Sequence, residues 1–476
     1  MTLPAVATKS RLPAVRLDHA GIRHVDQRAL LALALPLMLN STIQLALNLT
    51  DTWFIGRLSV DALAAVGAVN FLALVFILAL GGVGIGVQTL VAQAWGAGSS
   101  LHASRYAWLG LWAALITAPL FVLLACAAHP LLSPFDLAPA LEDLAADYWY
   151  PRLLGAPLAV ALWAVTGFFN GIGRTRITVV VMALVALLNA ALNQVLIFGL
   201  GLGVAGSAWA TTISMAAGTA FAIGMFLSPT QRLRYRTHLT WRATRRGLKR
   251  VFALGIPTGV FPAVDLAAIS LFQLMQVRLG PVPGAATQIV MMLTSIAYMP
   301  AIGIALAGTT LVGQSIGAGD KPWAERLGNR VIFLVMGYMG TIGIAIALGG
   351  HRLIPLFIDA AQPDAKAVIA MGLSLIWIAG AYQLFDAVNL ACAFCLRGAG
   401  DVRVPTLYLM VLAWAGFVPL AHMLSFDRGD GWVSFLPQFG WGATGGWLAA
   451  LIYIVALGTM MGMRWRSRAW QRVILT

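Results

Sequence analysis

The sequence predicts an all-α integral membrane protein in which twelve transmembrane helices form two six-helix bundles related by a pseudo-twofold axis. Three observations lead to this prediction. Of the 476 residues, 60% are hydrophobic and only 10% are charged, which is too little charge to cover a soluble surface. Apolar runs of about 20 residues, enough to cross a hydrocarbon core of about 30 Å, recur along nearly the whole chain. The two halves of the chain also resemble each other.

The resemblance between the halves is clearest in two pairs of segments. LVAQAWGAG at 90–98 returns as LVGQSIGAG at 311–319, and GIGRTR at 171–176 corresponds to GAGDVR at 398–403. Each half contains six apolar runs, and an even number returns both halves to the same orientation in the membrane. The repeat therefore predicts a pseudo-twofold axis along the membrane normal, with a binding site between the halves.

The apolar runs are predicted to be helices, because backbone groups in lipid must form hydrogen bonds within their own segment. We expect the spans of the first half near 29–55, 62–89, 104–127, 144–169, 177–199 and 204–227. We expect those of the second half near 250–279, 285–314, 328–349, 365–396, 404–425 and 441–463.

Basic segments flank the two bundles. The predicted bundles cover 29–227 and 250–463, with an N-terminal arm at 1–28, a linker at 228–249 and a tail at 464–476. The linker alternates arginine with Leu, Tyr and Trp and contains no acid, which favours a helix lying on the inner leaflet. Nucleic-acid binding by the linker is the weaker alternative.

The distribution of basic residues predicts the orientation of the chain. Of the 31 Lys and Arg residues, 25 fall in segments on the side that carries both termini. The positive-inside rule therefore places both termini in the cytoplasm. Loops facing an anionic leaflet also explain the net charge of +14, so we expect no nucleic-acid partner. The first apolar stretch is too long for the core of a cleavable signal peptide.

The three cysteines are predicted to be packing residues. Cys126 is isolated, whereas Cys392 and Cys395 lie one turn apart in an apolar run. Neither a His nor a Cys cluster accompanies that pair, so a metal or redox site is not expected there.

Three acidic side chains fall inside the predicted spans, where an ionised group costs several kcal/mol and usually serves a function. They are Asp51, Asp265 and Asp386. Tyr382 precedes Asp386 by four residues and Asn389 follows it by three, so the three oxygen-bearing groups share one helix face. Such a face offers ligands to a hard monovalent cation. The alternative is structural, with each carboxylate bonded to a neighbouring helix.

The first half has a polar stripe of its own. Asn40, Gln44, Asn48 and Asp51 lie on one face of the first span, and the fifth span carries the pair Asn189 and Asn193. We interpret these six residues as lining a polar cavity in the N-terminal bundle. Two alternatives remain, an interfacial and solvated Asp51 and an asparagine pair that joins helices.

Aromatic and methionine side chains on spans seven and eight are candidates for an adaptable pocket. Packing against lipid is the alternative for each of them. They are Phe261, Phe272, Met275, Met291 and Met292.

Several stretches resemble the multidrug and toxic compound extrusion (MATE) family, in particular its bacterial NorM-like branch. They are NLTDTWFIGRL at 48–58, the two repeated segments LVAQAWGAG and LVGQSIGAGD, and AYQLFDAVNLACAFCLRGAGDVRVP at 381–405. The resemblance covers about residues 28–465. It implies an antiporter of the bacterial inner (plasma) membrane that expels small cationic amphiphilic compounds in exchange for inward Na⁺ or H⁺.

The resemblance also implies site residues. In that branch a carboxylate on span seven and an Asp–Tyr pair on span ten form the cation site, which corresponds here to Asp265, Asp386 and Tyr382. These three would bind Na⁺ if the protein is coupled to sodium. The usual span-seven acid is Glu, and the shorter Asp265 leaves the choice of ion open. Further candidates for the substrate cavity are Gln288, Gln273 and Asn389.

A second branch of the family uses two aspartates in the first half. Asp51 corresponds to one of them, but Asn193 stands where the other is expected. This departure weakens an Asp–Asp proton pair in the N-terminal bundle. Asp51 with Asn189 and Asn193 remains a candidate for a group that responds to protonation.

Two rivals to the exporter remain. A flippase for lipid-linked saccharides in the same superfamily would be expected to have extra spans or a strongly basic central cavity, and no Lys or Arg lies in the middle of a span. A membrane enzyme or receptor would need a site such as paired histidines, and the 7 histidines are scattered. We therefore expect a monomeric transporter rather than an enzyme, with no cofactor besides the coupling ion.

Overall fold

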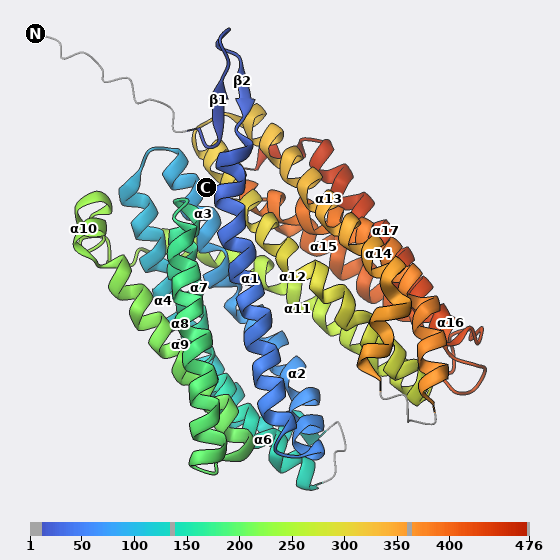
Figure 1. The fold of residues 1–476 in the computed structure, drawn as a ribbon. Helices are drawn as coiled ribbons and strands as arrows, with labels where there is room; N and C mark the ends of the chain where they lie inside the picture. The colour runs from blue at the N-terminus through green and yellow to red at the C-terminus, as the bar shows by residue number, and fades with distance from the viewer. Residues whose placement is uncertain (1–11, 134–138, 359–363, 474–476) are drawn as a thin grey trace, which may run out of the picture.

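A computed structural model describes residues 12–133, 139–358 and 364–473. Within these residues, 12 helical segments are long and apolar enough to cross a membrane, which confirms the predicted all-α fold. Figure 1 shows two groups of helices that meet at the end bearing the β1–β2 hairpin and diverge toward the opposite end. We call the first of these the closed end and the second the open end.

The first half contains six spans, three of which are built from two consecutive segments. Their bounds are α1 (Gln27–Gly56), α2 (Val60–Ile85) with α3 (Val87–Gly96), α4 (Ser100–Cys126), α6 (Pro139–Leu154) with α7 (Ala156–Gly171), α8 (Thr175–Asn193) with η2 (Gln194–Gly199), and α9 (Gly203–Phe226). A short helix, α5 (Ala128–Leu132), follows α4. The carboxylate of Asp26 caps α1 by accepting from the backbone of Arg28 and Ala29, which satisfies two orphan donors of the first turn.

The second half repeats this arrangement. Its spans are α11 (Arg245–Arg278), α12 (Pro281–Gly317), α13 (Lys321–Leu353) with η3 (Ile354–Phe357), α14 (Ala365–Ala399), α15 (Arg403–Val411) with η4 (Leu412–Phe417) and α16 (Val418–Ser425), and α17 (Gly442–Arg466). Across the halves, α1 packs on α12 and α2 packs on α11. Span one therefore contacts span eight, and span two contacts span seven. A twofold axis that relates the halves makes these two contacts equivalent.

The closed end is held by a reciprocal pair of hydrogen bonds between the repeats. Gln93 Nε2 donates to the carbonyl of Gly398 at 3.0 Å, and its counterpart Gln314 donates to the carbonyl of Gly171 at 2.7 Å. The helices approach closely here, since a side chain at Gly96 would overlap the backbone of Gln314. The side chains of these two glutamines therefore donate the hydrogen bonds between the halves. The backbone of Gln314 is also a point of close contact between the helices.

The predicted surface helix over the linker is interrupted in its middle. Residues 229–235 form α10 (Pro229–Tyr235) and residues 245–249 begin α11, but residues 236–244 between them have no regular structure. The Trp108 indole donates to the carbonyl of Thr237 at 2.7 Å, and Ser104 on α4 hydrogen-bonds Thr240 at 3.0 Å. These contacts hold residues 236–244 against the first half.

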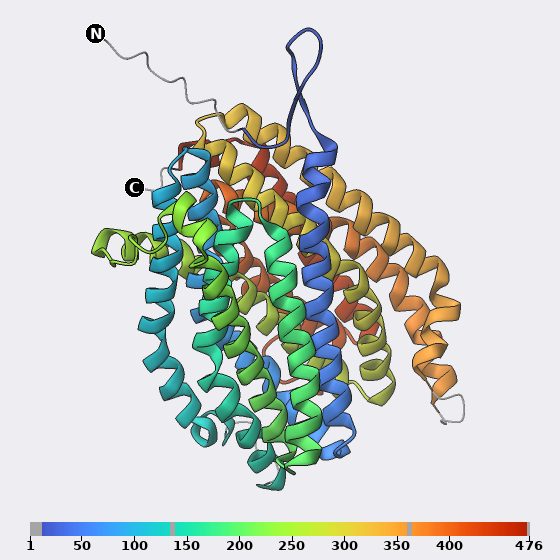
Figure 2. The same cartoon turned by 60° about the vertical axis from the view of Figure 1, so that its left-hand side comes forward.

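The N-terminal arm contains an element that the sequence did not predict, an antiparallel hairpin of β1 (Val15–Leu17) and β2 (Arg23–Val25). It projects beyond the helices in both views (Figure 1 and Figure 2). Arg23 forms an ion pair with Asp320 of the second half at 2.8 Å, and the Trp323 indole donates to the carbonyl of Pro13 at 3.0 Å. The arm therefore connects α1 to the start of α13.

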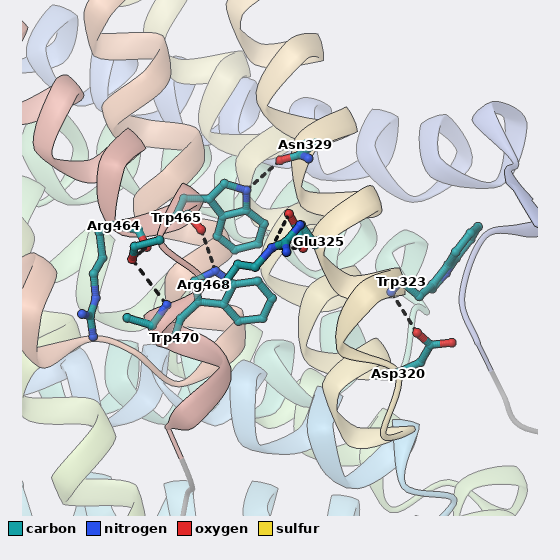
Figure 3. Close-up of polar contacts among 10 residues, drawn as sticks. Asp320, Trp323, Glu325, Asn329, Arg464, Trp465, Arg468 and Trp470 are labelled. Atoms are coloured by element: carbon teal, nitrogen blue, oxygen red, sulfur yellow. Dashed lines mark hydrogen bonds and ion pairs between the residues drawn. The ribbon is translucent and has the colours of Figure 1, made fainter.

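The C-terminal segment after α17 folds back onto α13. Figure 3 shows the Trp465 indole donating to Asn329, at 2.8 Å, and the Arg468 side chain paired with Glu325, at 2.9 Å. The rings of Trp465 and Trp470 stack with centroids 4.6 Å apart. These contacts fix the short helix η5 (Ala469–Arg472) at the closed end.

We expect the double substitution Gln93→Ala and Gln314→Ala to loosen the closed end. Each lost hydrogen bond costs about 1 kcal/mol, so together they shift the equilibrium of closed and separated states by roughly 30-fold. Spin labels at Ala97 and Ala318, with the three native cysteines replaced, report the distance across the closed end by pulsed EPR. The expected result is a new, longer distance in the double variant.

The matched control is Gln273→Ala, because that amide bonds Met291 within one half and does not join the bundles. An unchanged distance distribution in the double variant would contradict a role of the two glutamines in holding the halves together.

Candidate functional site

A central cavity of about 670 Å³ lies between the two halves and is lined from both of them. Side chains of α1, α2, α7 and α9 form one wall, and side chains of α11, α12, α14 and α17 form the other. Such a cavity at the repeat interface allows polar groups to sit at membrane depth without facing lipid.

The acids of the second half lie together in this wall. Asp265, Asp386 and Tyr382 all line the cavity. Asp386 Oδ1 accepts a hydrogen bond from Asn389 Nδ2 at 3.2 Å, and Asp265 Oδ1 accepts one from the Tyr453 hydroxyl at 2.9 Å. Among the described residues, neither carboxylate forms a salt bridge. The cavity therefore presents two carboxylates that no arginine or lysine neutralises.

Two tyrosines of this wall were missed by the sequence analysis. Tyr453 and Tyr298 both line the cavity, and Tyr453 contacts an acid 188 residues away in the chain. The only available signal was a phenol inside an apolar span, where a buried hydroxyl needs a partner. That signal identifies a polar contact without naming the partner.

The polar residues of the first half divide into two groups. Asn40, Gln44 and Asn48 line the central cavity. Asp51, Asn189 and Asn193 do not appear in its lining, so the prediction that all six residues line one polar cavity is wrong for these three. The reason is the hydrogen-bond cluster that they form among themselves.

In that cluster, Asp51 accepts from Asn193 Nδ2 at 2.6 Å and from the Thr211 hydroxyl at 3.2 Å. Asn193 also donates to Asn189 at 3.1 Å, and both asparagines are fully buried. The cluster joins α1, α8 and α9. Asp51 is thus a hydrogen-bonded, half-buried carboxylate and not a freely solvated one. The asparagine pair joins helices, which was the alternative to a cavity lining in the sequence analysis.

Two substrate-cavity candidates lie outside the cavity. Gln288 is exposed, whereas the adjacent Thr287 is buried and accepts from the Trp447 indole at 3.1 Å. One residue turns a helix by about 100°, which is enough to move Gln288 to the outer face. Gln273 does not line the cavity and instead donates to Met291 Sδ at 3.1 Å. Asn389, the third candidate, does line the cavity.

The apolar candidates divide in the same way. Phe261, Phe272 and Met291 line the cavity. Met275 is buried in the core of the second half, and Met292 is 40% exposed on the outer surface. Two aromatic side chains and one methionine of the predicted set therefore contribute to the pocket wall.

Two arginines also reach the cavity, which the sequence analysis did not anticipate. Arg397 stands near the C-terminal end of α14 and Arg152 at the break between α6 and α7, and both are part of the lining. The long arginine side chain spans the distance from a helix end into the polar space. Absence of basic residues in mid-span therefore did not mean absence of basic side chains in the cavity.

The donor set of the acidic wall suits a monovalent cation. Over the described ranges, no group of three or more His, Cys, Asp and Glu side chains could hold a metal ion. Two carboxylates with nearby amide and phenol oxygens match a hard, singly charged cargo such as Na⁺ or an organic ammonium. Cys392 and Cys395 are buried and free.

Comparison with known proteins decides the family. A family model described as MatE matches residues 36–195 and 267–421, which is more than half of the chain. The chain belongs to the MATE family. The resemblance found in the sequence is thereby confirmed.

Relatives within the MATE family cover nearly the whole chain. The "Probable multidrug resistance protein NorM" of Rhizobium meliloti (strain 1021) is 29% identical over 442 residues, which is 92% of this chain and 92% of that protein. The protein of the same description from Pseudomonas aeruginosa is 31% identical over 457 residues, 93% of this chain and 90% of its own.

Solved MATE structures share the fold. One described as the outward-facing conformation of a multidrug resistance MATE family transporter of the MOP superfamily has a TM-score of 0.79. It is 20% identical in sequence and covers 93% of this chain and 96% of that chain. At this identity the likeness shows the arrangement of the helices alone.

We expect Asp51 and Asn193 to stabilise this MATE fold as a pair. Hydrogen bonds to a charged group contribute about 1.5–3 kcal/mol in soluble proteins and less in membranes, so a coupling energy of about 1–2 kcal/mol is expected here. A double-mutant cycle with Asp51→Asn and Asn193→Ala, followed by denaturant unfolding in detergent, measures it.

The control cycle pairs Asp51→Asn with Asn40→Ala, which lies about 16 Å away along α1 and should couple by less than about 0.5 kcal/mol. Equal coupling in both cycles would show that the 2.6 Å contact has no specific role.

Proposed function

We propose that the chain exports small cationic amphiphilic compounds and takes up Na⁺ or H⁺ in exchange. The observation that carries this proposal is the pair Asp265 and Asp386, two carboxylates without a basic partner in the wall of a cavity between the repeats. Unpaired negative charge in a low-dielectric site attracts a positive ligand strongly. The relatives described as probable multidrug resistance proteins support the same conclusion.

Charge asymmetry supports the orientation. The basic segments lie at the closed end, which the positive-inside rule assigns to the cytoplasm. The cavity then faces the outside of a bacterial plasma membrane, as the divergence of the helices in Figure 1 indicates. In this state a cation from outside reaches Asp265 and Asp386, and a bound cargo leaves.

Exchange follows if cation and cargo compete for the same carboxylates. A ligand shifts the two states of a transporter only by its differential affinity for them. Occupation by the coupling ion releases cargo, and the halves then rock so that the contacts of Gln93 and Gln314 open toward the cytoplasm. A membrane potential adds about 2.3 kcal/mol per charge per 100 mV to the inward movement of the ion.

We expect Asp386→Asn to reduce ethidium efflux at least tenfold, because the neutral amide removes the charge for which ion and cargo compete. Efflux is measured in proteoliposomes at equal protein content, and size-exclusion chromatography checks the fold. The matched control is Asp430→Asn in the exposed loop before α17, which should transport like the parent. Undiminished efflux by the Asp386 variant would remove this carboxylate from the mechanism.

The coupling ion is identified by imposing a Na⁺ gradient and a pH gradient separately on the same proteoliposomes. We expect at least one gradient to drive ethidium exchange, since a bound ion must displace the cargo, and we expect Asp265→Asn to abolish that response. Transport that is indifferent to both gradients would contradict exchange by this site.

A further inference from the structure

Arg397 lies in the cavity wall near the C-terminal end of α14. Its Nη2 donates to the Thr309 hydroxyl at 3.3 Å, and its guanidinium lies 4.1 Å from the centroid of the Phe394 ring. Its Nε is buried without a hydrogen-bond partner. Within residues 12–133, 139–358 and 364–473, Arg397 forms no ion pair.

The nearest acid in sequence does not neutralise this arginine. Asp401 also lines the cavity, but its Oδ2 accepts from Arg464 Nε at 2.8 Å, and its side chain is only 4% exposed. A buried charge without a partner is costly, and a guanidinium uses several donors at once when it meets an anion. Arg397 therefore has donor capacity that the protein itself leaves unused.

Arg397 shares a helix stripe with the acidic site. It follows Asp386 by 11 residues, which turns an α-helix by about 20° beyond three full turns. Leu390 and Ala393, which lie between them, also line the cavity. The axial separation is about 16 Å, and the arginine leans one turn back over Phe394, as helical side chains do. The two charges are thus about 11 Å apart along one wall.

We propose that Arg397 forms an anion subsite of the cavity, and that this residue determines the preference of the transporter for cargo that carries a carboxylate as well as an amine. The amine of such a compound meets Asp386, and its carboxylate meets the guanidinium of Arg397. The inference rests on the proposed function and assigns one residue to its selectivity. A purely cationic cargo satisfies only the acidic end of this stripe, whereas a zwitterion satisfies both ends.

The experiment compares two fluorescent dyes that differ in one carboxylate. Rhodamine 110 carries a free carboxylate, and rhodamine 123 is its methyl ester. Transport of each into the external medium is measured in phosphatidylcholine proteoliposomes, and the readout is the ratio of their kcat/KM values. We expect R397Q to lower the ratio of acid to ester at least tenfold, and R397K, which keeps the positive charge, to lower it less.

A second variant tests the same point without removing the arginine. A393E places a carboxylate four residues before Arg397, the spacing at which Glu and Arg pair on a helix. This internal partner should occupy the guanidinium and lower the ratio at least tenfold as well. If R397Q fails to fold, A393E decides the question.

Three outcomes would overturn the inference. An equal loss of transport of both dyes in R397Q and A393E would make Arg397 a structural residue. An unchanged ratio of kcat/KM values in both variants would show that Arg397 does not bind the carboxylate. A change that appears only when phosphatidylglycerol is included in the liposomes would assign the subsite to a lipid headgroup. Failure of the parent protein to transport rhodamine 123 would instead count against the proposed function.

Discussion

The cost of placing charge in hydrocarbon decides where the ionised side chains of the spans lie. Asp265, Asp386 and Arg397 all line the central cavity, because the lipid-facing surface would cost each of them several kcal/mol. A cavity wide enough for these groups requires the two bundles to diverge. The bundles must then be joined elsewhere, and the closed end supplies that contact. The charged site and the closed end are therefore two consequences of one constraint.

The closed end is suited to a contact that must also open. The bonds that Gln93 and Gln314 make between the halves are neutral, from side-chain amides to backbone carbonyls, and each contributes about 1 kcal/mol. One ion moving through 100 mV supplies about 2.3 kcal/mol, which is comparable with the pair. A buried ion pair at the same place would be much harder to separate. The chemistry of the contact thus matches the energy available to break it.

The sequence predicts features that depend on neighbouring residues and misses those that depend on distant ones. Asp386 and Asn389 are three residues apart, and helical spacing alone brings them together at 3.2 Å. The contact of Asp265 with Tyr453 depends on how α11 meets α17, which no local pattern encodes. Gln288 was misplaced because the rotation of α12 about its axis is set by packing. The long apolar runs fixed the number of spans, but the hairpin at the N-terminus carries no comparable signal.

The twofold relation extends to features that the repeated sequence segments do not show. The counterpart spans five and eleven each contain a π-turn, η2 and η4. In the first half, η2 directly follows Asn193, which donates to Asp51. In the second half, η4 ends at Phe417, which stacks at 4.9 Å on Tyr453, the donor to Asp265. A π-turn shifts the residues that follow it around the helix and is common at functional sites. In each half, then, the irregular turn lies beside a residue that holds an acid: η2 begins directly after Asn193, and η4 ends at the residue that stacks on Tyr453.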